Sequence, residues 1–378
     1  MDLEKLLRST LDSRASDLHL KLGNVPHIRV DGELRPVPEH AAVSAEDMAN
    51  VVSAMMNERQ RAEFESSSQC DLAYSVGGFG RFRVNVFRQR GSVAVALRVI
   101  SDPPVSFTDI HLPQAVEKLA SEHRGLVLVT GVAGAGKSTT LAAIMDRINS
   151  TRPAHIITIE DPIEFLHQDK LSLVDQREVR IDTPDFASAL REALRQDPDV
   201  ILVGEMRDAE TIHTALVAAE TGHLVFSTLH TLDATESVQR MIAVFPPHAQ
   251  QQVRLMLAAT LKGVISQRLL KRRDVAGRVP AVEVLVTTDY IRECIVKPEK
   301  TYLIPHAIAA GGSQYGMQTF DQSLFRLFTE GLITFEDALD HASKPDDLRL
   351  RLAGIRSESG GMPESAEPVA PADHRGPS

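Results

Sequence analysis

The chain has 378 residues, 43% hydrophobic and 24% charged, which is typical of a globular protein of about two domains. It contains 41 Lys and Arg against 51 Asp and Glu, and a net charge of −10 disfavours nucleic acid as a partner unless the basic residues gather in one patch. No stretch is apolar enough to span a membrane and residues 1–10 lack a signal-peptide pattern, so we expect a cytoplasmic protein without direct membrane insertion. Cys70 and Cys294 are too few for a four-thiolate zinc site and are expected to be packed thiols.

Residues 1–100 are predicted to form a small α+β domain. Leucines recur with helical spacing from Leu3 to Leu11, which indicates an amphipathic first helix. Alternating apolar residues on both sides of Asp31-Gly32 predict a two-residue hairpin, and Ser44 with Asp47 predicts a capped second helix. Two further strands are expected over 79–87 and 92–100.

Residues 114–356 are predicted to form an α/β domain, which follows a proline-rich interdomain linker at 101–113. Continuous apolar strands alternate with helices of about twelve residues, as in a parallel sheet covered on both faces. The expected strands cover 126–130, 156–159, 200–203, 224–228 and 282–286, and the expected helices 138–149, 184–195, 209–221 and 247–269. Residues 357–378 have no periodicity and are predicted to be a disordered tail.

A glycine-rich segment follows the first strand of this domain and precedes a helix. The segment Gly131-Val-Ala-Gly-Ala-Gly-Lys-Ser138 matches the phosphate-loop pattern, whose backbone amides and lysine bind nucleotide phosphates. We therefore predict binding of ATP with Mg²⁺, in which Ser138 holds the metal ion. The predicted nucleotide-binding residues are Gly131, Gly134, Ala135, Gly136, Lys137, Ser138 and Thr139.

Acidic residues follow the next two predicted strands, at the sheet edge where the phosphates of a bound nucleotide would lie. Asp161 and Glu164 follow the strand at 156–159, and Glu205 follows the strand at 200–203. Glu205 is placed to orient or deprotonate an attacking water. Asp161 and Glu164 are further catalytic candidates, and Glu164 is also a candidate metal ligand. His230 ends the following strand, where an imidazole would sense the γ-phosphate.

Five arginines, Arg81, Arg83, Arg88, Arg90 and Arg98, lie in a stretch of the first domain that has no acidic residue. One interpretation is a nucleic-acid surface, but strand alternation sends the nearby aromatic ring at position 82 away from its flanking arginines. The better interpretation is that these arginines contact nucleotide phosphates. Solvated strand arginines remain a third possibility.

The motifs together resemble the secretion ATPase superfamily and, within it, the PilT/PilU family of type IV pilus retraction ATPases. The resemblance covers residues 1–356. It implies an N-terminal PAS-like domain, a RecA-like core, a homo-hexamer, and ATP hydrolysis that powers pilus retraction. It further implies arginine fingers at Arg83 and Arg98, with Arg81 as the alternative. The motifs that carry it are Ala15-Ser-Asp-Leu-His-Leu, the phosphate loop, Thr158-Ile-Glu-Asp-Pro-Ile-Glu164, Gly204-Glu-Met-Arg-Asp208, Thr221-Gly-His-Leu-Val-Phe-Ser-Thr-Leu-His230 and Gly316-Met-Gln-Thr-Phe-Asp-Gln322.

The resemblance also implies partners and a location. The partners would be an inner-membrane pilus platform protein and other pilus motor ATPases, and the location would be the inner face of the cytoplasmic membrane. This chain departs from the usual phosphate loop of the family at Val132, Ala133 and Ala135, where two hydroxyl groups are lost. Two alternatives therefore stay open: an accessory retraction ring with weak hydrolysis, and a nucleic-acid translocase on the same core.

Overall fold

The computed structural model describes residues 1–30, 32–37, 40–76, 80–100, 107, 110–275 and 277–354. The predicted tail, most of the predicted linker and residue Asp31 of the first hairpin lie outside these residues. The chain divides into two compact units. One contains Met1–Ile110, Ala120–Leu126 and Lys137–Leu229, and the other contains His111–Leu119, Val127–Gly136 and the chain from His230 onward. Among the described residues, no helix is long and apolar enough to cross a membrane.

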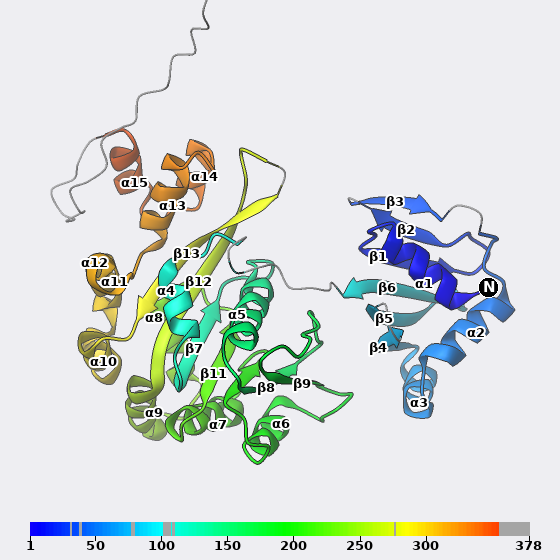
Figure 1. The fold of residues 1–378 in the computed structure, drawn as a ribbon, viewed down its shortest axis with the longest axis horizontal. Helices are drawn as coiled ribbons and strands as arrows, with labels where there is room; N and C mark the ends of the chain where they lie inside the picture. The colour runs from blue at the N-terminus through cyan, green and yellow to red at the C-terminus, as the bar shows by residue number, and fades with distance from the viewer. Residues whose placement is uncertain are drawn as a thin grey trace, which may run out of the picture. The chain divides into compact units, whose positions relative to one another are not determined.

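The N-terminal part contains a six-stranded sheet in the order β3-β2-β1-β6-β5-β4 (Figure 1). Its neighbouring strands all pair antiparallel, and β2 and β3 form the predicted hairpin. The sheet therefore has one face for a core and one face for other uses. The strands are β1 Asp17–Lys21, β2 His27–Val30, β3 Glu33–Pro36, β4 Gln69–Val76, β5 Gly80–Gln89 and β6 Ser92–Ile100.

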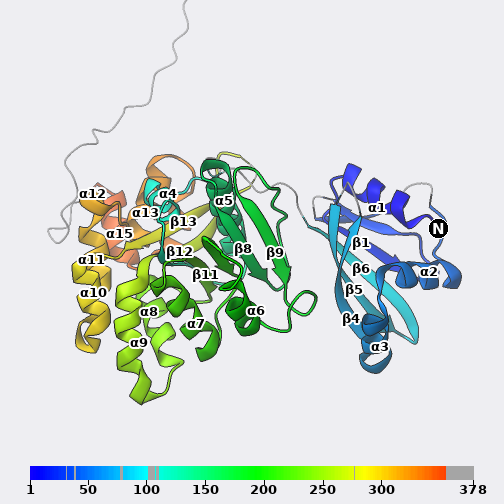
Figure 2. The same cartoon turned by 60° about the horizontal axis from the view of Figure 1, so that its bottom comes forward.

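Three helices pack on the apolar face of this sheet: α1 Leu3–Asp12, α2 Ala45–Met55 and α3 Glu58–Ser67 (Figure 2). Ser44 and Asp47 form the predicted capping box at the start of α2. Phe82 of β5 is fully buried in the core beneath the helices, so the arginines on either side of it point to the opposite face, as strand alternation predicts. The described residues contain the predicted helices and strands, and β1, α3 and β4 are additional to the predicted elements.

A second sheet of seven strands has the order β13-β12-β7-β11-β10-β8-β9. Strands β11, β10, β8 and β9 pair in parallel, which agrees with the predicted α/β class. The strands are β7 Gly125–Thr130, β8 His155–Glu160, β9 Leu173–Glu178, β10 Val200–Val203, β11 Leu224–Leu229, β12 Leu261–Lys271 and β13 Arg278–Val286.

Helices flank this sheet, and α6 packs against β8 and β10 while α7 packs against β11 (Figure 2). The predicted helix at 184–195 begins two residues later than expected, because the side chain of Asp185 caps it by accepting from the backbone amide of Ser188. Cys294 of α10 is buried as a free thiol, like Cys70 of β4. The helices are α4 Gln114–Ala120, α5 Lys137–Thr151, α6 Phe186–Ala193, α7 Ala209–Glu220, α8 Ala234–Ala243, α9 Pro247–Thr260, α10 Asp289–Val296, the 3₁₀ helix η1 Pro298–Leu303, α11 Ile304–Ala310, α12 Gly312–Tyr315, α13 Phe320–Thr329, α14 Phe335–Asp340 and α15 Pro345–Leu352.

The prediction of one long helix over 247–269 is wrong. Helix α9 ends at Thr260, and the chain continues directly as β12, which pairs antiparallel with β13 along most of its length. Apolar residues of β12 recur with a spacing that also fits a helix, so local periodicity does not separate the two conformations. Pairing with β13, which lies beyond an intervening hairpin, decides in favour of a strand.

Candidate functional site

The predicted phosphate loop connects β7 to α5. Gly131 has a φ of +145°, and a Cβ atom there would lie 2.6 Å from the carbonyl oxygen of Gln267 and 2.9 Å from the Cβ of Ala135. Gly134 and Gly136 also have positive φ values, of +79° and +88°. These are the conformations that allow a loop to turn its backbone amides inward, and the first position accepts only glycine.

The positions at which this loop departs from the usual family sequence differ in their surroundings. Val132 is 51% exposed and Ala133 is also exposed, so both side chains face solvent. Ala135 is buried, and its backbone amide donates a hydrogen bond of 3.1 Å to the carbonyl oxygen of Val132. The loop therefore keeps this backbone hydrogen bond although it lacks the two hydroxyl groups of the usual family sequence.

Lys137 begins α5 and is buried, as few lysines are. Burial lowers the pKa of its ammonium group, and the negative charges of Glu164 and Glu205 act in the opposite direction. Ser138 and Thr139 follow in the first turn of the helix and are partly exposed. The structure therefore brings the predicted lysine and two of the three predicted carboxylates into one electrostatic cluster, next to the N-terminus of a helix that favours anions.

Hydrogen bonds join the ends of three parallel strands, two of which, β8 and β10, precede these carboxylates. The backbone amide of Gly204 donates to the carbonyl oxygen of Ile159 at 2.8 Å. The hydroxyl of Thr228 donates to the carbonyl oxygen of Gly204 at 2.6 Å, and the hydroxyl of Ser227 donates to that of Val203 at 2.7 Å. The strand ends are thus fixed relative to one another, which holds Glu205 beside the segment that carries Asp161 and Glu164.

Two of the predicted carboxylates have arginine partners that the sequence did not reveal. Arg207 contacts Glu205 with an Nε to Oε1 distance of 2.7 Å, and Arg180 donates to Asp161 at 2.9 Å. Both arginine side chains are largely exposed, so these ion pairs add little stability and can be exchanged for other partners. In this state the two carboxylates are held by the protein's own cations.

A buried carboxylate, Glu160, ends β8 directly before the predicted acidic residues. Burial raises its pKa, while hydrogen bonds from Thr158 and Gln176 favour the charged form. Gln176 of β9 also accepts from the backbone amide of His167 at 2.8 Å and donates to the carbonyl oxygen of Phe165 at 2.9 Å. Gln176 therefore fastens the loop that follows Glu164, a role that only its spatial neighbours reveal.

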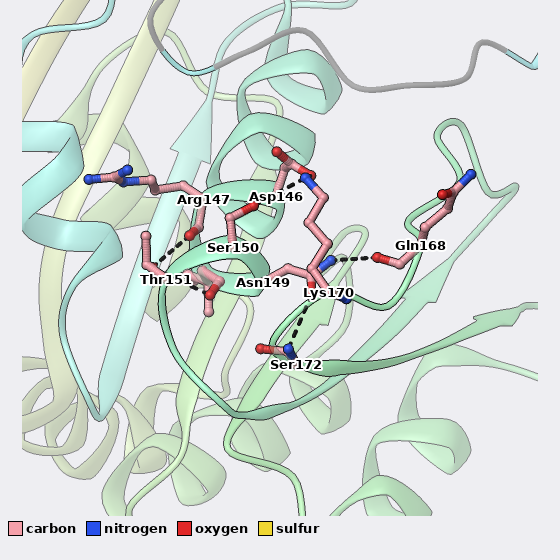
Figure 3. A network of polar contacts seen from close by, with 9 residues as sticks. Asp146, Arg147, Asn149, Ser150, Thr151, Gln168, Lys170 and Ser172 are labelled. Atoms are coloured by element: carbon pink, nitrogen blue, oxygen red, sulfur yellow. Dashed lines mark hydrogen bonds and ion pairs between the residues drawn. The ribbon is translucent and has the colours of Figure 1, made fainter.

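A second polar network fastens the same connection from the far end of α5 (Figure 3). The Asn149 side chain donates to the carbonyl oxygen of Gln168 at 2.7 Å and accepts from the backbone amides of Lys170 and Ser172. The Lys170 ammonium group donates to Asp146 at 2.6 Å. One helix thus begins at the phosphate loop and ends at the segment that leads from the acidic residues into β9.

Comparisons with known proteins agree with this geometry. The family model described as type II/IV secretion system protein matches residues 1–289. The chain is 46% identical over 352 residues to a protein of Pseudomonas aeruginosa named type IV pilus retractation ATPase PilT, covering 92% of this chain and all of the relative. It is 46% identical over 325 residues to a twitching motility protein of Neisseria gonorrhoeae, covering 85% and 86% of the two chains. The crystal structure of the pilus retraction motor PilT with bound ADP superimposes with a TM-score of 0.84 at 44% identity, covering 92% of this chain and 99% of the other.

The chain belongs to the type II/IV secretion system protein family. The comparisons confirm the predicted family, the fold class and the assignment as an ATPase of the pilus retraction type. His230 of this ATPase is exposed and follows β11 directly, as predicted. Among the described residues, no group of three or more His, Cys, Asp or Glu side chains is arranged to hold a metal ion.

The predicted arginine fingers of this ATPase lie on the six-stranded sheet. Arg83 of β5 stands directly opposite Arg98 of β6, and both side chains are exposed. Arg88 projects to the other face, where its guanidinium group lies 5.2 Å from the centre of the Phe64 ring. Arg90 occupies the turn between the two strands. The five arginines of the sequence run therefore do not form one surface.

Proposed function

We propose that this chain is a hexameric motor in which ATP hydrolysis powers the retraction of a type IV pilus. The observation that carries the proposal is the cluster of Lys137, Glu164 and Glu205 beside a phosphate loop. Support comes from the relatives, which match over nearly their whole length and are described as a pilus retraction ATPase and a twitching motility protein.

The residues present fit a nucleotide with Mg²⁺. Gly131 has no room for a side chain, and the loop that starts there ends in the N-terminus of α5, where backbone amides and Lys137 would bind the phosphates. Ser138 and Glu164 offer the oxygen ligands that Mg²⁺ prefers. Bound Mg²⁺ would neutralise charge on the phosphate oxygens during transfer. Gly134, Ala135, Gly136 and Thr139 complete the proposed nucleotide-binding residues.

In this proposal, Glu205 orients the attacking water and accepts its proton, because its carboxylate follows a buried strand and acts on the same lysine as Glu164. Glu205 would exchange its ion pair with Arg207 for the water when nucleotide is present. Asp161 would likewise release Arg180 when nucleotide is present. His230, exposed after β11, would sense the γ-phosphate.

Arg83 and Arg98 are proposed to stabilise the charge that develops on the transferred phosphoryl group, which links catalysis to the position of the N-terminal domain. Motion of that domain would then become force on an inner-membrane platform protein. We place the hexamer at the inner face of the cytoplasmic membrane, where other pilus motor ATPases would share the same pilus. We retain the predicted boundaries: an N-terminal PAS-like domain over 1–100, a linker over 101–113 and a RecA-like domain over 114–356.

The test uses Lys137→Ala in the full-length protein and in a strain that lacks the gene. The substitution removes a phosphate-binding charge at a cost of about 3–4 kcal/mol in transition-state stabilisation, which corresponds to a loss of about 10²- to 10³-fold in turnover. We expect hydrolysis to fall by that factor while the oligomer stays assembled in size-exclusion chromatography. Complementation with the wild-type gene should restore twitching, and complementation with Lys137→Ala should not. Normal turnover of Lys137→Ala would disprove the site.

Two alternatives predict different outcomes of the same assays. An accessory ring, suggested by Val132, Ala133 and Ala135 in the loop, would show weak hydrolysis in the purified wild-type protein and would need a second motor for retraction. A nucleic-acid translocase would show hydrolysis that DNA stimulates and salt-dependent DNA binding. The net charge of −10 and the separation of the arginines onto different faces argue against the second alternative.

A further inference from the structure

One row of charged residues crosses four neighbouring strands on the face of the six-stranded sheet opposite α1–α3. Arg29 of β2 pairs with Asp17 of β1, Asp17 pairs with Arg98 of β6, and Arg98 pairs with Arg83 of β5. Three arginines and one aspartate thus occupy adjacent positions of one ladder. Asp17 belongs to the segment Ala15-Ser-Asp-Leu-His-Leu, to which the proposed function gives no role.

The side chain of Asp17 is largely buried in this row, whereas that of Arg98 is exposed. The exposed fractions are 12% for Asp17 and 70% for Arg98. Nε of Arg98 donates to Oδ1 of Asp17 at 2.9 Å, and the hydroxyl of Ser16 donates to Oδ2 at 2.7 Å. Nε of Arg29 lies farther away, 3.9 Å from Oδ2. The carboxylate therefore contacts the inner nitrogen of the Arg98 guanidinium group while most of that side chain stays accessible.

The charge on Asp17 is secured by these contacts. Burial by itself would raise the pKa of the carboxyl group, but hydrogen bonds from Ser16 and Arg98 outweigh it and lower the pKa below its usual value. Asp17 consequently remains a fixed negative charge at the base of Arg98 throughout the neutral pH range. A fixed charge of this kind restrains a long side chain that would otherwise sample many rotamers.

Two positive charges lie at directly opposite positions of this row. Like charges that face each other directly across two antiparallel strands repel, and Arg83 and Arg98 do so. Asp17 compensates Arg98 from one side only, because its position in the ladder is on the strand away from Arg83. The row thus has a net positive charge at Arg83 and Arg98. The hydrogen bond from Nε of Arg98 to Asp17 orients the Arg98 side chain.

We propose that Asp17 is a positioning residue for ATP hydrolysis: it holds Arg98 by its inner nitrogen, so that the outer guanidinium nitrogens face the γ-phosphate together with Arg83. This inference rests on the proposed role of Arg98 as a finger. Asp17 itself touches neither nucleotide nor metal. Its effect should appear in the turnover number and disappear when Arg98 is absent.

The experiment measures kcat and KM for MgATP in full-length Asp17→Asn, Arg98→Ala and the double variant. Asp17→Asn should lower kcat by about tenfold, a typical coupling between directly bonded side chains, and change KM by less than about twofold. In the Arg98→Ala background, Asp17→Asn should have no further effect on kcat. An equal effect of Asp17→Asn in both backgrounds would overturn the inference.

Three further variants separate positioning from structure. Asp71→Asn removes an acid from β4, on the same sheet face and paired with Asn85 rather than with an arginine, and should leave kcat unchanged. Asp17→Glu keeps the charge but not the shape and should retain more kcat than Asp17→Asn; the reverse order would indicate a merely structural role. Arg29→Ala removes the distant partner and should leave kcat within about twofold of wild type.

The outcomes also distinguish this inference from the proposed function. A normal kcat for Arg98→Ala would show that Arg98 is no finger, and the role of Asp17 would fall with it, whereas the ATPase site that Lys137→Ala tests would stand. A low kcat for Arg98→Ala with a normal kcat for Asp17→Asn would leave the finger in place and overturn only the role of Asp17. Melting temperatures of all variants, measured without nucleotide, would show whether a loss of kcat reflects unfolding.

Discussion

The two sheets of this protein display their polar residues in different ways. The six-stranded sheet is antiparallel and packs helices on one face only, so its other face carries charged residues along the middle of its strands, such as Arg83 and Arg98. Strands β10 and β11 of the seven-stranded sheet are buried along their length, and the candidate functional side chains Glu205 and His230 lie just beyond their last residues. The candidate functional residues therefore lie on an open face of the six-stranded sheet and at the carboxyl edge of the seven-stranded sheet.

This difference decides how each kind of site tolerates change. A side chain on an open face is positioned by its ladder neighbours, so its orientation depends on residues from other strands. A side chain at a strand end is positioned by the backbone of that strand, which hydrogen bonds such as Thr228 to Gly204 hold in place. Substitutions at the face should therefore alter orientation, and substitutions at the edge should alter chemistry alone.

The largest expected effect lies at the face. Arg83→Ala or Arg98→Ala should lower turnover by about 10³- to 10⁵-fold and weaken nucleotide binding far less, because a finger arginine acts on charge that develops in the transition state. Lysine at either position should rescue poorly, since a point charge does not reproduce the forked geometry. Steady-state kinetics together with binding of a fluorescent nucleotide measure both quantities.

Arg88→Ala and Arg90→Ala are the matched controls, because Arg88 lies on the opposite face and Arg90 in a turn. Their turnover should be close to that of the wild type. Equal losses at all four arginines would show a general anion-attracting surface and would remove the distinction between the face and the rest of the domain.

The next effect lies at the edge. Glu205→Gln keeps the size and hydrogen bonding of the side chain but removes the base, so we expect turnover to fall by about 10²- to 10⁴-fold with nucleotide still bound. The variant should retain ATP, rather than ADP, after gel filtration. Phosphate release at the wild-type rate would contradict the role of Glu205 and would leave the edge as a binding site only.

The smallest effect concerns a buried acid of the second sheet. Burial raises the pKa of Glu283 on β13 to about 7, the nearby Asp233 and Asp321 act in the same direction, and Arg268 opposes them. Its Oε1 accepts from the backbone amide of Ala234 at the start of α8 at 2.9 Å. Between pH 4.5 and about 7 the folded protein binds this proton more tightly than the unfolded chain does. The contribution of Glu283 to stability therefore falls as pH rises through that window and is constant above it.

Glu283→Gln retains the hydrogen-bond acceptor and removes the titration. Melting temperatures measured from pH 5 to pH 8 should show the wild type losing a few degrees relative to Glu283→Gln as pH rises. The exposed Glu336 supplies a control, since Glu336→Gln should follow the wild-type curve. A constant difference between wild type and Glu283→Gln across this range would show that Glu283 does not titrate there.

The sequence predicted those parts of the fold that local signals determine. Strand β10 and helix α7 are hydrophobic or amphipathic over their whole length, and both are found where periodicity places them. Strand β12 was predicted as helix, because its conformation depends on pairing with β13. Strand β9 was not predicted, because an edge strand with three charged residues among its six lacks the apolar pattern of its neighbours. Helix α3 was missed for a similar reason, since Phe64 is its one buried residue.

The candidate site divides in the same way. The phosphate loop and the acidic residues at the strand ends follow from motif and topology, so Lys137, Glu164 and Glu205 could be predicted together. The groups that hold them in place could not be predicted, because Arg180 and Gln176 lie on elements whose spatial neighbours the sequence does not specify. The bond from Arg98 to Asp17 joins residues 81 positions apart and depends on strand register alone.

The packing of the phosphate loop determines where evolution can alter it. A methyl group at Gly131 would overlap the backbone of β12, and flexible side chains cannot relieve that overlap. Val132 and Ala133 project into solvent, so a lineage can exchange proline, threonine, valine or alanine there without moving the backbone that we propose binds phosphate. A search for distant relatives should therefore weight the first glycine heavily and the next two positions hardly at all.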